Sequence, residues 1–260
     1  MLERIFKPFG FRDMTSVDRW SVRLFWIVAA ALFWQFYPAG PLFPRPTGTW
    51  NAAVWMFQNG LVEDIVVSGS RIIQSAFYAF LVGSVLGYMY NIGFFQEIVT
   101  FIALLRNVMM GLIVALFLIG HITGERLILT TMFFMILVYF VSGLIQIMDD
   151  INGDLIDHGI TMRMSYWQIL WHRVIRGKSY FVFMAFIPCI AMGWSMLSFV
   201  EGYSRSRGGI GDRMLQIDKI SSYDGLLALG IVSGLVGFGL WFSLKKFGKW
   251  KFKWAISKSV

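Results

Sequence analysis

The sequence predicts an all-α, polytopic membrane protein with about six transmembrane helices and one long polar insert. Hydrophobic residues make up 57% of its 260 residues and charged residues 15%, with a mean hydropathy of +0.64, whereas a soluble domain carries about 25% charged residues. Aromatic residues reach 17%, which suits belts at the two membrane–water interfaces. We expect one transmembrane domain that includes the whole chain.

Six segments supply the roughly 20 mostly apolar residues that a helix needs to cross a bilayer. No small-residue cleavage site follows the first segment, which is therefore predicted to be a retained anchor and not a signal peptide. Small residues at a spacing of four, Gly83 with Gly87 and Gly230 with Gly234, indicate close helix packing. The predicted spans are 20–37, 70–90, 98–119, 127–148, 181–200 and 225–244.

The distribution of basic residues predicts the orientation of these spans. An even number of spans places both termini on one side, and both are basic, with six lysines and no acid after residue 244. The excess of Lys and Arg on cytoplasmic segments predicts that both termini are cytoplasmic. Segments 38–69, 121–126 and 201–224 would then lie outside, whereas 91–97 and the insert 149–180 would lie inside.

The sequence offers no pattern for covalent chemistry, and we predict no catalytic residue, no metal site and no nucleic-acid partner. The Gly-Lys-Ser of segment 176–180 lacks the earlier glycine of a phosphate-binding loop, and the three histidines have no partners at metal-ligand spacing. Charges at membrane depth usually face a bundle interior or a water-filled cavity. We therefore predict a solute pathway that includes Arg106, Trp194, Ser198 and Glu201.

The insert is polar in its first half and amphipathic in its second. Trp167, Leu170, Trp171 and Val174 have helical spacing. Ser165 is placed to act as the N-cap of that helix. The insert is therefore predicted to form a helix, a turn and a second helix along the membrane surface.

The insert resembles the cytoplasmic coupling region of type I ABC importer permeases, in the nitrate, taurine and alkanesulfonate branch. The match is carried by the segment Met164-Ser165-Tyr166-Trp167-Gln168-Ile169-Leu170, since this branch commonly has Ala-Ser-x-Trp-Gln-x-Leu there. The family's Glu-Ala-Ala is replaced by Asp157-His158-Gly159, its glycine by Arg163 and its proline by Arg176. Arg163 is therefore expected to be incompatible with any left-handed turn that a glycine would serve there.

Other stretches resemble the same branch in the same order, over about residues 41–254. They are the Pro-x-Pro of Pro44-Arg45-Pro46, the Ser70-Arg71 start of the second span, Arg106 before Gly120 to Glu125, and Glu201 before Gly209-Ile210-Gly211.

The resemblance implies a permease subunit of an ATP-driven importer in the bacterial inner membrane. Its implied partners are a cytosolic ABC ATPase dimer, a second permease subunit in a homodimer or heterodimer, an extracytoplasmic substrate-binding protein and the lipid bilayer. It implies no cofactor on this chain, because ATP and Mg²⁺ belong to the ATPase. It assigns ATPase docking to Asp157, His158, Gly159, Arg163, Ser165, Tyr166 and Trp167.

The outer segment 201–224 is glycine-rich and is expected to meet the binding protein or form an outer gate. Arg205, Arg207, Gly209 and Gly211 are the predicted contacts, and the two arginines would favour an anionic ligand.

Two other functions remain open. The departures from the coupling motif would suit a non-transporting structural subunit, paired with a typical paralogue or placed in a larger complex. A secondary transporter would require inverted repeats, and the sequence has none that we can detect.

Overall fold

A computed structural model describes residues 16–36, 44–149, 161–169, 171, 175–204, 208–220 and 222–252, and this part of the chain contains helices and no strand. The helices are α2 Ser16–Phe36, α3 Pro46–Gln58, α4 Leu61–Met89, α5 Gly93–Leu104, η2 Leu105–Asn107, α6 Met110–Ile119, α7 Gly124–Asp149, α9 Tyr166–Ile169, α10 Arg176–Ser204, α11 Ile210–Lys219 and α12 Tyr223–Lys251.

Four helices, α4, α7, α10 and α12, are long and apolar enough to cross a membrane. They include the predicted spans 127–148, 181–200 and 225–244 and all but the last residue of 70–90, and each extends beyond the prediction at one or both ends. The first predicted span, 20–37, corresponds to α2, which contributes a shorter apolar stretch, Trp20–Phe36.

The predicted span 98–119 is not one continuous helix. The structure divides this segment into α5, η2 and α6, and the two halves are bent by 105°. The bend follows the polar pair Arg106–Asn107, where Val108 and Met109 take extended backbone conformations. The described residues therefore provide four spans, or five if the bent pair crosses as one, in place of the six predicted.

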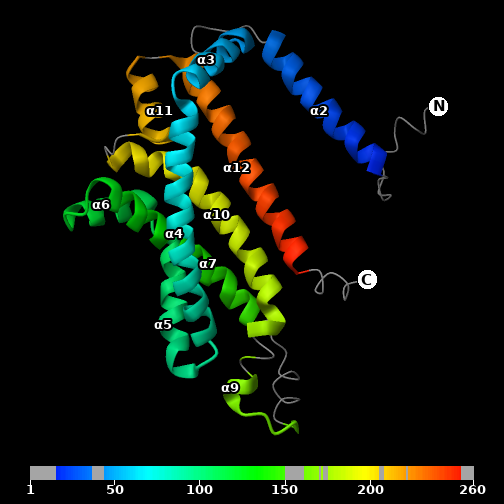
Figure 1. The fold of residues 1–260 in the computed structure, drawn as a ribbon, viewed down its shortest axis with the longest axis vertical. Helices are drawn as coiled ribbons and strands as arrows, with labels where there is room; N and C mark the ends of the chain where they lie inside the picture. Colours follow the sequence, from blue (N-terminus) through cyan, green and yellow to red (C-terminus); the bar gives the residue numbers. More distant parts are fainter. Residues whose placement is uncertain are drawn as a thin grey trace.

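Helices α4, α7 and α10 form the centre of the bundle, and α12 packs against α10 (Figure 1). Phe80 of α4, Phe140 of α7 and Phe186 of α10 meet with ring centroids 4.8–5.6 Å apart. Helices α3 and α11 lie at one end of the bundle, and α9 lies at the other (Figure 1). Helices α3 and α11, from segments predicted to lie outside, are thus at the opposite end from α9, which belongs to the predicted cytoplasmic insert.

The two glycine pairs, Gly83 with Gly87 and Gly230 with Gly234, differ in how closely other helices pack against them. A Cβ on Gly83 or Gly87 of α4 would lie 2.6 Å from Phe140 or 2.5 Å from Leu144 of α7, so this pair packs closely as predicted. A Cβ on Gly230 or Gly234 of α12 would meet nothing within 4 Å, so the described part of the chain does not make the packing predicted for that pair.

We expect Gly87→Ala to lower the free energy of unfolding by about 1 kcal/mol, because an added methyl group would overpack the contact with the Leu144 side chain of α7. Gly234→Ala is the matched control, since the space around it is open. Thermal unfolding of the purified protein in detergent would compare the two. Equal melting temperatures would show that α4 and α7 do not approach as closely as described.

Candidate functional site: a buried ion-pair network and two cavities

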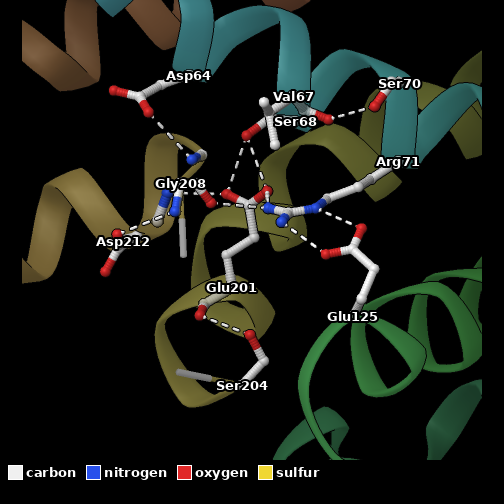
Figure 2. A network of polar contacts seen from close by, with 12 residues as sticks. Asp64, Val67, Ser68, Ser70, Arg71, Glu125, Glu201, Ser204, Gly208 and Asp212 are labelled. Carbon is white, nitrogen blue, oxygen red and sulfur yellow. Dashed lines mark hydrogen bonds and ion pairs between the residues drawn. The ribbon is translucent and has the colours of Figure 1, made fainter. Parts of the chain in front are cut away.

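Among the described residues, the most buried charged side chains are those of Arg71 of α4 and Glu201 of α10, which form a pair (Figure 2). Arg71 Nη1 donates to Glu201 Oε1 over 2.7 Å, and the two side chains are 4% and 0% exposed. Isolated charges are very costly to bury, so such groups are normally paired and hydrogen-bonded. The pair therefore joins α4 and α10 by an interaction that water does not screen.

Each charge of this pair has further partners. Ser68 Oγ lies 2.8 and 3.0 Å from the two oxygens of Glu201, and the Gly211 amide donates to Oε2 over 2.8 Å. Arg71 also donates to Glu125 at the start of α7 from Nε over 2.8 Å and from Nη2 over 2.7 Å. This bidentate geometry is the stronger form of an arginine–carboxylate contact. Three helices therefore converge on one guanidinium (Figure 2).

The loop before α11 completes the network with its backbone. Gly208 and Gly209 have φ values of 78° and 109°, which glycine adopts at little cost. The Gly208 carbonyl accepts from Arg71 over 2.9 Å, and the Gly209 amide donates to Asp64 over 3.1 Å. A Cβ at Gly209 would lie 2.7 Å from Arg71 and Glu201. Glycine is therefore required for the loop to approach the buried pair.

Helix α11 is held to α4 by a second ion pair. Arg213 pairs with Asp64, and its Nη2 donates to the Asn59 carbonyl over 2.8 Å. Glu201 also lies at the N-terminus of α11, where the helix dipole favours a negative charge. The network (Asp64, Ser68, Arg71, Glu125, Glu201, Gly208–Gly211 and Arg213) thus fastens α4, α7, α10 and α11 together.

A cavity of about 700 Å³ lies between η2, α7 and α10, and we call it the Arg106 cavity. The Arg106 Nη1 donates to Ser142 of α7 beside it. The α7 residues that line it recur at helical spacing and form one face of that helix. Its lining residues are Arg106, Tyr139, Ser142, Gly143, Gln146, Ile147, Lys178, Phe181, Ala185, Pro188, Cys189 and Met192.

A second cavity, of about 780 Å³, lies nearer the end that holds α11, and we call it the Ser198 cavity. Its described lining carries no charged side chain. The lining residues are Leu118, Thr123, Ser198, Phe199, Gly202, Tyr203, Ser204, Gly211, Met214 and Leu215.

The two cavities follow one another along the same face of α10. Phe181, Pro188 and Met192 line the first, and Phe199 and Gly202 line the second. Together with Ala185, which also lines the first cavity, and residue 195, these positions recur every three or four residues, the spacing of one helix face. Exposed residue 195 lies on that face between the two groups. One side of α10 therefore extends from a charged cavity to an uncharged one.

The structure separates the four predicted pathway residues. Arg106 and Ser198 line the two cavities. Trp194 is 5% exposed and donates to the Ser233 carbonyl of α12 over 2.9 Å, so it packs between helices. Glu201 is enclosed in the network and lines neither cavity. Trp194 and Glu201 thus line neither cavity, and the prediction that all four residues belong to a solute pathway stays a prediction.

The described part of the insert confirms the prediction that Ser165 is a helix N-cap. The Gln168 amide donates to Ser165 Oγ over 3.4 Å, and the Ser165 amide donates to Gln168 Oε1 over 2.9 Å. This reciprocal arrangement is a capping box. Helix α9 begins at Tyr166 and ends at Ile169. Asp157, His158 and Gly159 lie outside the described residues, as do the side chains of Tyr166 and Trp167.

Arg163 overturns one sequence-based expectation. Its φ is 54°, in the left-handed region, although the arginine was expected to be incompatible with such a turn. The turn before α9 therefore has the backbone conformation that a glycine would favour.

Two of the four predicted outer-loop contacts, Gly209 and Gly211, fall within the described residues. Gly209 and Gly211 are buried against Glu201 and so do not form an exposed contact surface in this structure. Arg205 and Arg207 lie outside the described residues.

Sequence reasoning missed Asp64, Ser68 and Arg213 in the network, and Lys178 in the Arg106 cavity. An arginine inside a span needs a carboxylate partner. The presence of Arg71 in a predicted span could therefore have pointed to Glu125 and Glu201 as its partners.

No protein-family model and no curated protein matches this chain.

Proposed function

We propose that this chain is the permease subunit of an ATP-driven importer in a bacterial inner membrane, with both termini cytoplasmic. It would form a solute pathway and connect that pathway to a separate cytosolic ATPase. The observation that carries the proposal is the single face of α10 that lines both cavities. A pathway with alternating access requires such a surface, reachable from each side in turn.

The position of the insert also supports the proposal. It connects α7 to α10, and α10 carries the cavity-lining face. A force applied at α9 would therefore act directly on the helices that line the Arg106 cavity. Rigid movement of packed helices is a common way to transmit such a force.

The turn at Arg163 supports the motif alignment that the proposal uses. The family pattern has a glycine at this position, and Arg163 has a φ of 54°. A left-handed non-glycine residue costs on the order of 1 kcal/mol. Strain of this kind occurs at functional sites, where the surrounding structure imposes it.

The test is to solubilise native membranes gently, purify this chain and identify its partners by mass spectrometry. Residues 157–163 are then replaced by a Gly/Ser linker of equal length. We expect an ABC ATPase to co-purify with the natural chain and to be lost with the linker. The control variant carries Arg205→Ser and Arg207→Ser, on the predicted outer side, and should retain the ATPase.

Two results would contradict the proposal. If no ATPase co-purifies, or if it stays bound to the linker variant, the insert is not a coupling element and the structural-subunit function replaces the proposed one. A second permease chain in the sample would establish a heterodimer.

Substitutions at Arg163 separate its backbone conformation from its charge. We expect Gly and Asn to retain the co-purifying ATPase, because both tolerate a positive φ. Val should reduce it several-fold, since a β-branched residue is disfavoured there. The ATPase-to-permease ratio after purification measures the effect. A loss that is equal for Asn and Val would assign the role to the charge and not to the turn.

A further inference from the structure

One side of α12 presents a line of side chains that ends in two lysines, and we call it the α12 stripe. Its members follow one another at intervals of four and three residues, the spacing that keeps side chains on one face of a helix. Its apolar members are between 42% and 66% exposed. The lysines lie one turn apart near the end of α12. The stripe consists of Ile231, Leu235, Phe238, Phe242, Lys245 and Lys249.

The stripe lies beside the face by which α12 contacts α10. A Cβ on Gly237 would lie 2.7 Å from Trp194, and one on Gly248 would lie 2.7 Å from Met184, so these two glycines mark the contact face. Of the four candidate spans, α12 has the smallest buried share, 17% of its apolar segment. A membrane-spanning helix therefore offers the α12 stripe to whatever surrounds the bundle.

The charged end of the stripe lies in a positive region of the molecule. No Asp or Glu follows Asp224 in the sequence. The rings of Tyr180 and Phe183 each lie 5.9 Å from the ring of Phe252, which places the start of α10 beside this end of α12. That start of α10 adds the exposed Arg176 to the lysines of α12. An anionic group is therefore the complement of this surface.

The aromatic residues around Lys245 are typical of the lipid headgroup level. The Lys245 Nζ lies 4.6 Å from the centroid of the Trp241 ring, within the range of a cation–π contact, and tryptophan is enriched at membrane interfaces. From Ile231 to Phe242 the helix rises roughly 16 Å at 1.5 Å per residue. This length is close to the roughly 15 Å of hydrocarbon in one leaflet. The stripe thus combines a headgroup-level charge with an apolar line of acyl-chain length.

A second copy of this chain is a poorer complement to the stripe than a lipid is. Two copies in one membrane share one orientation, so a dimer built on parallel α12 helices would bring the lysines of both stripes together. Like charges at close range repel each other, and α12 supplies no carboxylate there to compensate. A phosphate group would instead attract Lys245 and Lys249 at once.

We propose that the α12 stripe binds an anionic phospholipid, whose phosphate contacts Lys245 and Lys249 and whose acyl chain lies along Phe242, Phe238 and Leu235. Basic clusters at the end of a membrane-spanning helix are typical of anionic-lipid recognition. The inference goes beyond the proposed function and does not rest on it, because the site belongs to this chain alone.

The binding test is native mass spectrometry of the full chain in detergent. Dioleoyl phosphatidylglycerol is the probe, and dioleoyl phosphatidylcholine is its counterpart with the same chains and no net charge. We expect the phosphatidylglycerol to bind at least about tenfold more tightly, since each lysine near a headgroup contributes about a factor of five. Glycerol phosphate, the headgroup without chains, should not displace it at equal concentration. Equal affinities for the two lipids would overturn the role of charge, and displacement by glycerol phosphate would overturn the role of the apolar line.

Variants assign the binding to the α12 stripe. Lys245→Gln and Lys249→Gln should each weaken phosphatidylglycerol binding about fivefold, whereas Lys249→Arg should retain it because the charge remains. Lys251→Gln is the matched control, since Lys251 is also exposed but follows Lys249 by two residues and so lies on the opposite side of the helix. Equal losses in Lys249→Gln and Lys251→Gln would show a general attraction between charges and would overturn the proposed site.

A change in the apolar line tests the acyl-chain contact. Phe242 is 56% exposed, so Phe242→Ala removes contact area without opening the core and should weaken phosphatidylglycerol binding several-fold. The same spectra report the oligomeric state. A dimer that Phe242→Ala dissociates would assign the stripe to a second copy and overturn the proposal. A chain that binds the lipid but recruits no ATPase contradicts the proposed function alone.

Discussion

Arg71→Met is expected to lower the free energy of unfolding by about 3–5 kcal/mol, the usual result of removing one partner of a buried pair. The reason is that Glu201, with a side chain that is 0% exposed, would keep its charge without a cation. Glu125 would lose the same partner but is 52% exposed, so water replaces the contact. Chemical denaturation of the purified protein would measure the loss.

The double variant Arg71→Met with Glu201→Met distinguishes a pair effect from a packing effect. We expect it to be less destabilised than the sum of the two single variants by at least about 1 kcal/mol, since the uncompensated charge is removed. Arg126→Met, an exposed arginine of α7, is the control for loss of positive charge. Strict additivity of the two single changes would contradict the coupling of Arg71 with Glu201.

Gly211→Ala is expected to lower the free energy of unfolding by about 3 kcal/mol, the second largest loss among these variants. A Cβ there would lie 2.3 Å from the Ser198 carbonyl oxygen and 2.6 Å from Glu201 Cβ. A backbone carbonyl cannot rotate away as a side-chain end can, so α11 would have to move off α10. That movement would also break the 2.8 Å bond from the Gly211 amide to Glu201.

Gly69→Ala in α4 is the control for this substitution. Nothing lies within 4 Å of its added Cβ, so alanine should be neutral or stabilising there, by up to about 1 kcal/mol. Circular dichroism during thermal unfolding would compare the two variants. Similar melting temperatures for Gly211→Ala and the natural protein would show that α11 is not docked on α10 as described.

The long spans were predictable because each is a continuous apolar run. Segment 127–148 lies within α7, which ends at Asp149 where the apolar pattern ends. The bend between α5 and α6 was not predicted, since the apolar run continues across it and only Arg106 and Asn107 interrupt the pattern. A bond from Arg106 to another helix carries no local signature.

The ion-pair network could not be predicted from any local stretch of the sequence. Its central contact joins residues 130 positions apart, so no sequence window contains both. Helix α11 was missed because segment 201–224 has the composition of a loop, rich in glycine and charge. Its helix is amphipathic, and its apolar positions Ile210 and Ile217 are buried in the bundle.

The separation of Arg71 and Glu201 has a consequence for the biogenesis of the protein. Arg71 emerges from the ribosome 130 residues before Glu201, which is on the order of ten seconds at ordinary rates of synthesis. Glu125 emerges 54 residues after Arg71 and is therefore the first carboxylate of the network to reach it from another helix. Until α7 is made, α4 carries Arg71 without a carboxylate from another helix, and a nascent chain stalled before α10 would carry a half-assembled network. Chaperones and membrane proteases that survey unfinished proteins would meet that intermediate in every round of synthesis.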